Sequence, residues 1–445
     1  MTEISKKKQE ILVGSSKLNL LKENHFDKNK FFVENMMHNK AFLYHVKKNH
    51  IETNSQEQLK LLENFRTRYI NYRSDWVNSL KVKNINRPLS IDVELASICD
   101  LACPHCSREY IVTPDKIMNM NLYKKIIDEI SIMEVPSIKL NWRGEPLLHP
   151  NIFECIDYAK KKGILEVIIN TNATSLTKKK SEELIDSGLD YIIYSFDGGS
   201  KATYEKMRPG RFKKNAYENV IQNIKNFKEI RDQKNAKFPV TKIQMIMTSE
   251  TRNEINDFYK TFGTIVDDVT VTQYNERGGN LNDLDANTKN KLTNYLNENN
   301  LPLDTSYMVD IDKNIFISKK RKPCEQIYQR LMITYNGRVG MCCHDWGAQH
   351  GIGYISQDAF EEDKKFKEVF GKINEKKKGF ELMPNAKLPT KFNEPKKSID
   401  KIENIWKGKE LNTVRNAHEN DKVNSVEVCK NCTFKDTYEW EKITL

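Results

Sequence analysis

Three closely spaced cysteines are the residues of this chain that point most directly to chemistry. Cys99, Cys103 and Cys106 follow the strand-like stretch 90–95, with three and then two residues between them. An iron–sulfur cluster of the cubane type normally takes four thiolates, so three cysteines leave one iron without a protein ligand. Because an open coordination position distinguishes a reactive metal site from a structural one, this spacing predicts a reactive cluster at the end of a strand.

A zinc site is the alternative interpretation of the same cysteines. Structural zinc sites close with four ligands, usually in paired Cys-x-x-Cys spacing, so His105 would have to be the fourth ligand. His105 lies between Cys103 and Cys106 in the sequence. That position is poor for a tetrahedral chelate, and we therefore favour the iron–sulfur interpretation.

The grouping of the remaining cysteines indicates further metal or redox chemistry. The chain has nine cysteines, and Cys155 falls on the apolar face of a predicted helix, where we interpret it as a small core residue. In a chain of this size that is expected to be cytoplasmic, grouped cysteines favour metal binding over a disulfide framework. The grouped residues are Cys324, the adjacent pair Cys342 and Cys343, and the Cys-x-x-Cys of Cys429 and Cys432.

The elements that must position these residues are apolar strands alternating with helices from residue 88 onward. Such alternation predicts parallel βαβ units and an α/β fold, here a partial (β/α)6 TIM-like barrel. Ligands bind at the carboxyl ends of such strands, where the three cysteines and the polar segments described below fall. The predicted strands are 90–95, 138–142, 166–171, 191–196, 243–247 and 268–272. The predicted helices are 122–133, 152–162, 178–186, 217–230 and 254–262.

The sequence divides into four predicted segments. Residues 1–87 form a helical N-terminal extension without cysteine, including an amphipathic helix over 65–76, and residues 88–280 form the barrel. Residues 281–319 are expected to be a helical connector, and 320–445 a small cysteine-rich iron–sulfur domain. Within that last segment, 379–398 is expected to be irregular, and a helix over 402–417 leads to the final cysteines.

The three cysteines, directly after a strand, resemble the cluster-binding motif of the radical S-adenosylmethionine (SAM) enzymes. The resemblance implies that they hold a 4Fe–4S cluster whose fourth iron is chelated by SAM, and that His105 packs against the adenine. Arg143-Gly144-Glu145-Pro146, one βα unit later, resembles the Gly-Gly-Glu-Pro loop of that family, which binds the amino group of SAM. Arg143 stands where the family has its first glycine, and Gly144, Glu145 and Pro146 match.

Two later strand ends resemble other segments of the barrel mouth in this family. Asn172 ends one of them, and the Ser195-Phe196-Asp197-Gly198 stretch is similar to the segment that contacts the ribose and carboxylate of SAM. Hydroxyl and carboxylate groups suit ribose hydroxyls. Arg208 matches an arginine that related enzymes use to hold the methionine carboxylate. The alternatives are ordinary polar caps for the strand-end residues and a surface position for Arg208.

The late cysteines resemble the SPASM extension of radical SAM enzymes, in its shortened, twitch-like form. Cys324 is followed at a distance by Gly337, four residues and Cys342, and later by Cys429 and Cys432. The resemblance implies one auxiliary 4Fe–4S cluster on Cys324, Cys342, Cys429 and Cys432. Cys343 could replace Cys342, although the spacing from the glycine favours Cys342. A zinc knuckle with the same ligands is the alternative.

The implied activity is reductive cleavage of SAM to a 5′-deoxyadenosyl radical, which abstracts hydrogen from a substrate. The resemblance assigns no catalytic side chain to that abstraction, and the auxiliary cluster could accept an electron from the substrate. The twitch-like form leans toward a sugar-like or polyol small molecule that is oxidised; modification of a peptide or protein is the alternative. An electron donor such as flavodoxin or ferredoxin is expected as a partner.

Composition restricts the remaining function classes. The chain has 445 residues, a formal net charge of +11, 38% hydrophobic and 30% charged residues. No window approaches eighteen apolar residues and no signal-peptide core is present, so we expect a cytoplasmic protein without a membrane span. The positive charge permits a non-enzymatic, zinc-stabilised nucleic-acid-binding protein. The lysine runs lack interleaved aromatic residues, so nucleic acid is not the favoured partner.

Overall fold

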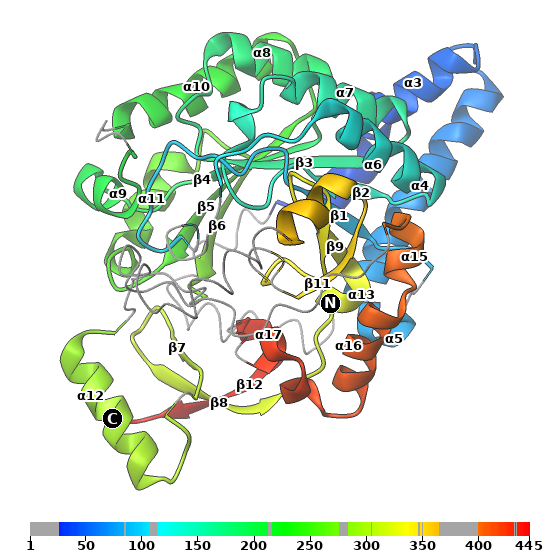
Figure 1. Ribbon diagram of the computed structural model, residues 1–445. Helices are drawn as coiled ribbons and strands as arrows, with labels where there is room; N and C mark the ends of the chain where they lie inside the picture. Colours follow the sequence, from blue (N-terminus) through cyan, green and yellow to red (C-terminus); the bar gives the residue numbers. More distant parts are fainter. Residues whose placement is uncertain are drawn as a thin grey trace.

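The computed structural model describes residues 26–83, 86–106, 108, 114–211, 216–275, 284–303, 305–345, 348, 350–364, 399–430, 432 and 434–445. A nine-stranded sheet organises this part of the chain, in the order β11-β10-β9-β1-β2-β3-β4-β5-β6 (Figure 1). The first six strands are β1 (Ser90–Val93), β2 (Ser137–Lys139), β3 (Glu166–Thr171), β4 (Tyr191–Ser195), β5 (Val240–Met247) and β6 (Asp268–Gln273).

These six strands are parallel to their neighbours throughout. Helices that follow the strands cover the outside of the sheet, which explains why Ile91, Ile138 and Ile192 are fully buried (Figure 1). The predicted α/β fold with alternating strands and helices is therefore confirmed. The helices are α6 (Met120–Ile132), α7 (Ile152–Lys161), α8 (Lys178–Ser187), α9 (Lys201–Met207), α10 (Tyr217–Gln233) and α11 (Ile255–Phe262).

The second strand is shorter than its apolar sequence suggested. The prediction was 138–142, but β2 ends at Lys139. Beyond that point the Asn141 side chain accepts a hydrogen bond from the Asn170 backbone at 2.8 Å, so a side chain replaces the backbone ladder. The polar residues that follow β2 therefore lie at the carboxyl end of this strand.

The cysteine-rich C-terminal segment continues the same sheet. Strand β9 (Arg330–Ile333) pairs with β1 in parallel, and β10 (Arg338–Gly340) and β11 (Gly351–Tyr354) add an antiparallel hairpin beyond it. Leu331 and Trp406 share one hydrophobic core with Ile91 and Ile138. The expected iron–sulfur segment is thus joined to the barrel by backbone hydrogen bonds and by a common core.

The connector predicted to be helical over 281–319 is helical only in its first part. Helix α12 (Ala286–Glu298) is followed by β7 (Tyr307–Val309) and β8 (Ile315–Arg321). With β12 (Tyr438–Ile443) these form an antiparallel sheet in the order β12-β8-β7. The alternation of Ile315 and Ile317 toward a small core explains the strand, a two-residue period that the prediction missed.

The N-terminal helices close the edge of the sheet opposite the cysteines. They are α2 (Lys28–Glu34), α3 (Lys40–Lys48), α4 (Gln56–Val77) and α5 (Ser79–Val82), and α4 contains the helix predicted over 65–76. Phe65 and Tyr69 of α4 pack with Leu165, Tyr191 and Val240, which lie where β3, β4 and β5 begin. Residues 1–25 of the predicted helical extension lie outside the described residues.

The C-terminal helices pack beside the extended sheet (Figure 1). The helix predicted over 402–417 is two helices, α15 (Ile402–Trp406) and α16 (Lys409–Glu419), because the chain breaks at Gly408, the residue preceding α16. Of the short helices, α13 (Gln326–Gln329) begins shortly after Cys324 and α17 (Glu427–Lys430) contains Cys429. The segment predicted to be irregular over 379–398 lies outside the described residues.

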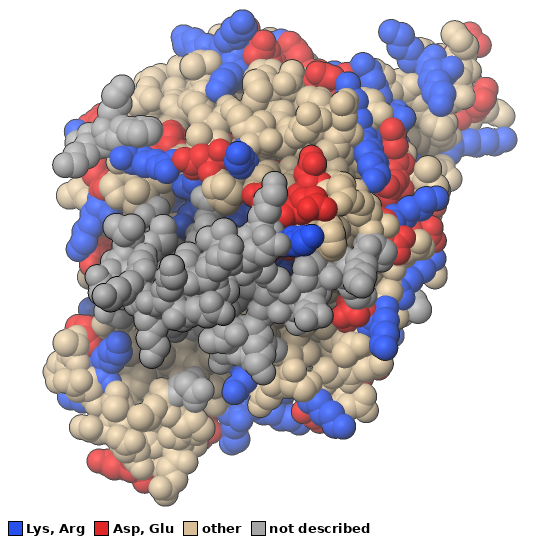
Figure 2. All heavy atoms as spheres, viewed as in Figure 1, with Lys and Arg blue, Asp and Glu red and all other residues tan. Residues whose placement is uncertain are grey.

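The described surface mixes charges of both signs. On the face drawn in Figure 2, Lys and Arg side chains lie next to Asp and Glu and do not form one continuous basic patch. None of the described helices has both the length and the apolar composition that crossing a bilayer requires.

Candidate functional site

The loop after β1 carries the three early cysteines and is held by a second segment. Backbone hydrogen bonds run from Ala102 N to Pro209 O (2.9 Å) and from Arg211 N to Asp100 O (2.8 Å). Within the loop, Cys106 N donates to Cys103 O at 2.9 Å, and Leu101 N donates to Cys99 Sγ at 3.5 Å. The segment after α9 therefore fixes the backbone that presents the thiols.

The loop after β2 packs directly on the cysteine loop. Gly144 has φ +71°, and a Cβ at this position would lie 2.3 Å from Ala96 O and 2.6 Å from Ile98 O. Glu145 N donates to Ile98 O at 2.8 Å. Only glycine fits this contact, and the structure brings together the two loops that the sequence motifs singled out. Pro146 begins the short 3-10 helix Pro146–Leu148.

The Glu145 carboxylate joins this loop to the end of β3. It accepts hydrogen bonds from Leu147 N (3.0 Å), Thr171 Oγ1 (2.7 Å) and Asn172 N (2.8 Å). Burial raises its pKa to about 7, although the three donors act in the opposite direction. A carboxylate has about four lone-pair positions, so Glu145 retains the capacity to accept from one further donor.

Asn172 connects the end of β3 to the cysteine loop. Its Nδ2 donates to Asp100 Oδ1 at 2.7 Å and lies 3.9 Å from Cys99 Sγ. The same carboxylate accepts a hydrogen bond from Thr174 Oγ1. Asp100 was not among the predicted site residues. The sequence pointed to it only through its place next to Cys99, because a carboxylate beside thiolates is unfavourable unless it is paired.

Three residues that were predicted separately form one buried polar group, in which Asp197 and Arg208 are the ion pair. Asp197 Oδ2 lies 2.7 Å from Arg208 Nη2 and 3.4 Å from His105 Nε2, and Asp197 is fully buried. Burial lowers the pKa of His105, while the Asp197 charge acts against it. His105 Nδ1 and Arg208 Nε are buried without a hydrogen-bond partner in the described structure. Ser195 lies half-buried at the end of β4, opposite Gln244 in the register.

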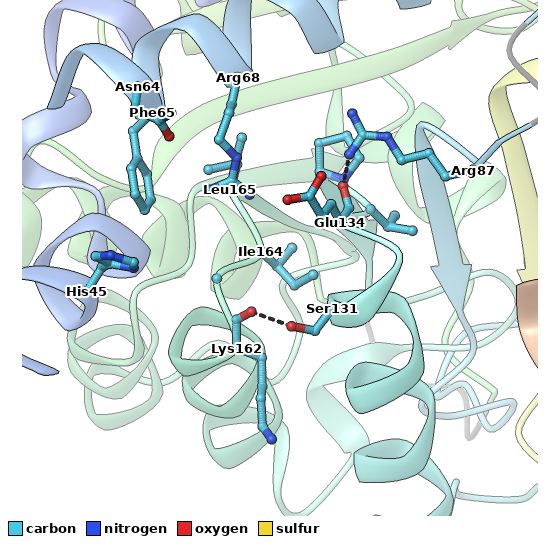
Figure 3. Close-up of a pocket in the computed structure, with 13 residues that line it drawn as sticks. His45, Asn64, Phe65, Arg68, Arg87, Ser131, Glu134, Lys162, Ile164 and Leu165 are labelled. Atoms are coloured by element: carbon cyan, nitrogen blue, oxygen red, sulfur yellow. Dashed lines mark hydrogen bonds between the residues drawn. The ribbon is translucent and has the colours of Figure 1, made fainter. Parts of the chain in front are cut away.

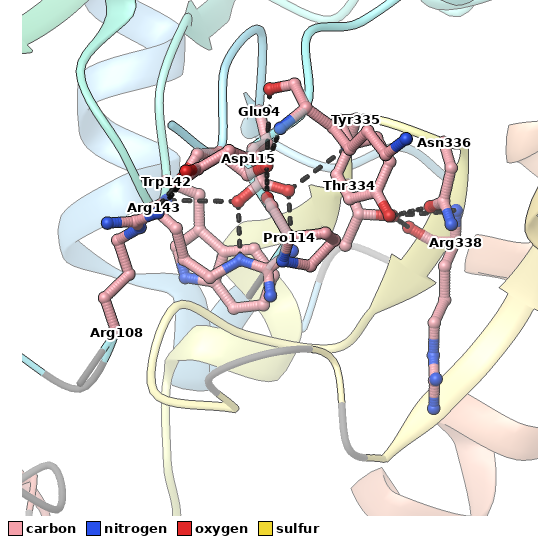
Figure 4. A network of polar contacts seen from close by, with 12 residues as sticks. Glu94, Arg108, Pro114, Asp115, Trp142, Arg143, Thr334, Tyr335, Asn336 and Arg338 are labelled. Carbon is pink, nitrogen blue, oxygen red and sulfur yellow. Dashed lines mark hydrogen bonds and ion pairs between the residues drawn. The ribbon is translucent and has the colours of Figure 1, made fainter. Parts of the chain in front are cut away.

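Arg143, the residue that departs from the family loop, forms an ion pair that the sequence did not predict (Figure 4). Its Nε and Nη2 lie 2.6 Å and 2.7 Å from the two carboxylate oxygens of Glu94, which follows β1. The same carboxylate accepts a hydrogen bond from Tyr335 N, which follows β9, at 3.2 Å. Glu94 thus joins the ends of β1, β2 and β9. In the sequence, this role is indicated only by the charge of Glu94 between the apolar residues Val93 and Leu95.

The four predicted auxiliary ligands line one cavity. Cys324, Cys342, Cys429 and Cys432 lie on its wall, although Cys324 and Cys432 are far apart in sequence. Cys343 does not line it: its Sγ donates to Gln326 Oε1 at 3.5 Å, and its carbonyl accepts a hydrogen bond from Trp142 Nε1 at 3.2 Å. The geometry therefore favours Cys342 over its neighbour.

The donor set at both sites fits iron–sulfur clusters. Burial raises the pKa of the Cys99 and Cys429 thiols to about 12, and it raises the pKa of the Cys103, Cys324 and Cys342 thiols still further. Thiolates in such surroundings require the positive charge of a bound metal. In the described part of the chain, no three potential ligands converge on a point where a single ion would be held.

A larger cavity lies at the opposite edge of the sheet (Figure 3). It has a volume of about 400 Å³ and lies between the N-terminal helices and the segments that precede β2 and β3. None of the predicted site residues lines it. Its polar lining residues include His45, Arg68, Arg87, Glu134 and Lys162.

Comparison with known families identifies two regions. Residues 93–262 match the family model described as the Radical SAM superfamily. Residues 324–383 match SPASM, described as an iron-sulfur cluster-binding domain. The first region contains the cysteine loop and the segments that gather around it, and the second contains Cys324 and Cys342.

Several curated proteins resemble part of the chain. The AdoMet-dependent heme synthase of Methanosarcina barkeri is 30% identical over 180 residues, which are 40% of this chain and 47% of that protein. The mycofactocin maturase MftC of Mycolicibacterium smegmatis is 24% identical over 176 residues, 40% of this chain and 42% of that protein. The PqqA peptide cyclase of Bradyrhizobium diazoefficiens is 30% identical over 112 residues, which are 25% of this chain and 29% of that protein. The chain spans less than half the length of these relatives.

Two solved structures are more distant. BtrN in complex with AdoMet and 2-DOIA has a TM-score of 0.41 and 16% identity, covering 80% of this chain and 99% of that one. Streptococcus suis SuiB bound to precursor peptide SuiA has a TM-score of 0.45 and 16% identity, covering 75% of each chain.

Proposed function

Because the chain contains a radical SAM domain followed by a SPASM domain, we propose that it is an enzyme that cleaves SAM and abstracts a hydrogen atom from a peptide substrate. When bound, the cluster and SAM supply the one-electron chemistry and the radical that removes the hydrogen. The observation that carries the proposal is the convergence of the cysteine loop, the Gly144–Glu145 contact and the Asp197–Arg208 ion pair at one edge of the sheet.

We assign the SAM-binding cluster to Cys99, Cys103 and Cys106. The protein presents these thiols on a backbone to which the Pro209 carbonyl and the Arg211 N–H are hydrogen-bonded. Asn172 and Asp100 lie beside Cys99 and position its sulfur. Hydrogen bonds of this kind around a cluster thiolate orient the ligand and adjust the cluster potential.

We assign the contacts to SAM to groups that retain hydrogen-bonding capacity. Glu145 can accept one further donor, which suits the ammonium of the methionine moiety. Asp197 holds Nη2 of Arg208 and leaves Arg208 Nε buried and unpartnered, which suits the methionine carboxylate. His105 Nδ1, also unpartnered, and Ser195 at the end of β4 lie on the same edge and suit the nucleoside.

The auxiliary cluster belongs to the SPASM domain, and we assign it to Cys324, Cys342, Cys429 and Cys432. Trp142 links the two sites, since its indole N–H donates to the Cys343 carbonyl, next to the proposed ligand Cys342. The shared sheet holds both sites in a fixed relation, which suits transfer of an electron from the substrate radical.

A peptide is the better supported substrate class. Among the relatives, one is described as a PqqA peptide cyclase and is 30% identical over 112 residues. The expected oxidation of a sugar or polyol has no such support among these relatives. An electron donor such as flavodoxin or ferredoxin stays a prediction.

The first experiment measures cluster content and SAM cleavage in anaerobically purified full-length protein. We expect about eight iron atoms per chain, four for each cubane, and 5′-deoxyadenosine on addition of SAM and dithionite. Cys99→Ala should abolish 5′-deoxyadenosine, whereas Cys155→Ala, a buried cysteine outside both sites, should retain it. Zinc in place of iron, with no SAM cleavage, would contradict the proposal and favour the nucleic-acid-binding alternative.

The second experiment identifies the substrate class. Deuterated peptides and deuterated polyols are incubated separately with enzyme, SAM and reductant, and deuterium in 5′-deoxyadenosine is measured by mass spectrometry. Transfer from a peptide supports the proposal. Transfer from a polyol alone would overturn the peptide assignment and restore the small-molecule expectation.

A further inference from the structure

His418 lies on the wall of the auxiliary cavity with one ring nitrogen occupied. It belongs to α16, is 1% exposed, and lines the cavity together with the four cysteines. Its Nδ1 accepts a hydrogen bond from the backbone N–H of Cys324 at 3.2 Å. A ring nitrogen that accepts a hydrogen bond carries no proton, so the imidazole is neutral with its proton on Nε2.

The protonated nitrogen of His418 has no acceptor within the described protein. Its Nε2 is buried and has no hydrogen-bond partner there. Leaving a buried N–H unpaired is unfavourable, so such groups in native proteins normally have an acceptor. Besides the four thiols, the cavity wall carries His344, apolar side chains and Gln326, whose Oε1 already accepts a hydrogen bond from Cys343 Sγ. The thiol sulfurs are therefore the most numerous acceptors that the cavity offers to Nε2.

Arg321, at the end of β8, adds a second donor and a positive charge. Its Nη1 donates to the carbonyl of Cys429, and its guanidinium lies 5.1 Å from the centre of the Tyr438 ring. Its Nε is buried without a partner in the described structure, and the residue lines the same cavity. Two unpartnered donors from two different elements thus border the four thiols.

We propose that His418 and Arg321 are positioning residues that donate hydrogen bonds to the sulfur atoms of the auxiliary cluster and make it easier to reduce. Reduction adds negative charge to the cluster, and nearby N–H donors and a guanidinium stabilise that charge. The inference rests on the proposed ligand set of Cys324, Cys342, Cys429 and Cys432. It deepens the proposed function, because a more easily reduced cluster is a better acceptor for an electron from the substrate radical.

The test isolates the auxiliary cluster in the full chain. A parent variant with Cys99, Cys103 and Cys106 changed to Ala should retain about four iron atoms. In this parent, His418→Leu and Arg321→Gln should each lower the ratio of reduced to oxidised cluster at a fixed potential about tenfold, which is about 59 mV for one electron. The measurement is a redox titration followed by electron paramagnetic resonance.

Two further variants distinguish a hydrogen bond from packing. His418→Gln keeps an N–H near the position of Nε2 and should restore most of the potential lost in His418→Leu. His45→Leu, at the opposite edge of the sheet, should leave the potential unchanged. If His418→Leu does not retain iron, the reduction potentials of His418→Gln and Arg321→Gln test the inference in its place.

Equal potentials in the parent, His418→Leu and Arg321→Gln would overturn the inference. Equal losses in His418→Leu and His418→Gln would overturn the hydrogen-bond role of His418. A parent variant without iron or a paramagnetic signal would instead overturn the proposed ligand set, so the two failures are distinguishable.

Discussion

Arg143 and Glu94 form a buried bidentate ion pair between the segments that follow β2 and β1, with N–O distances of 2.6 Å and 2.7 Å. The side chains are 5% and 0% exposed. Their importance follows from position: Gly144, the next residue, contacts the cysteine loop through Ala96 and Ile98. The arginine that replaces a family glycine therefore anchors the loop that bears the motif (Figure 4).

Replacing Arg143 with glycine should destabilise the protein even though it restores the family residue. The change leaves Glu94 charged and buried without its partner, a loss of about 3–5 kcal/mol in similar buried pairs. Anaerobic thermal unfolding of the full chain measures the effect. Glu94→Gln with Arg143→Met removes both charges and should recover much of the stability; equal stability of Arg143→Gly and the unmodified protein would contradict the prediction.

Gly144→Ala should disable SAM cleavage by displacing the cysteine loop. A Cβ at Gly144 lies 2.3 Å from the Ala96 carbonyl oxygen, a distance that forces backbone movement. We expect at least about a tenfold loss of 5′-deoxyadenosine formation, as misplacement by about 1 Å costs about 100-fold in other enzymes. Gly163→Ala is the matched control, because its φ is +86° but no atom lies within 4 Å of the added Cβ. It should cost about 1–2 kcal/mol of stability and keep activity; equal activity losses in both variants would refute the steric argument.

Cys342→Ala and Cys343→Ala should differ in iron content. Cys342 lines the auxiliary cavity, while the Cys343 thiol donates to Gln326 at 3.5 Å. We expect Cys342→Ala to lose about four iron atoms per chain and Cys343→Ala to keep both clusters. Iron and sulfide analysis with absorption spectra gives the result. The reverse pattern would move the ligand role to Cys343.

Glu145 should make stability depend on pH in a defined window. Burial raises its pKa in the folded chain to about 7, above that of an exposed glutamate. Between about pH 4.3 and 7 the folded state therefore binds more protons than the unfolded state, and stability falls as pH rises, by up to about 3–4 kcal/mol. Glu145→Gln should remove this part of the slope. Urea unfolding of the metal-free full chain at several pH values, with and without the substitution, measures this dependence. If the unfolding free energy changes with pH equally in both proteins, Glu145 does not have the raised pKa.

The α/β fold and the position of the cysteine loop after β1 could be predicted because their signals are local. Each of the strands β1 to β5 is followed by a helix that packs on the sheet, and the three cysteines lie in a single loop. Two other features, the neighbour of β1 in the sheet and the choice between Cys342 and Cys343, depend on contacts between residues that are far apart in the sequence. The parallel pairing of β1 with β9 brings together residues such as Asp92 and Arg330, which are 238 residues apart, and no periodicity encodes it. Likewise, spacing cannot separate Cys342 from Cys343, whereas the turn after β10 points only one of them into the cavity.

The polar residues around the two cysteine groups were less predictable than the grouping of the cysteines. Glu94, Asp100, Arg321 and His418 are polar residues of common type, and their roles depend on which buried partners the fold places near them. Connector residues 307–319 were expected to be helical, and the two-residue period at Ile315 and Ile317 is too short a signal to identify a strand without its partners. Their partner β12 lies at residues 438–443, beyond the reach of a local pattern.

The pairing of β1 between β2 and β9 has a consequence during synthesis. One edge of β1 can find its permanent partner only after residues 330–333 have left the ribosome. At about 5–20 residues per second, the growing chain carries this open apolar edge for roughly 10–50 s. During that interval the strand is available for pairing with other chains, which is the situation in which nascent proteins aggregate or require a chaperone. The cysteine loop after β1 therefore rests on a sheet whose central pairing is completed only when residues 330–333, which precede Cys342, Cys429 and Cys432 in the chain, have been made.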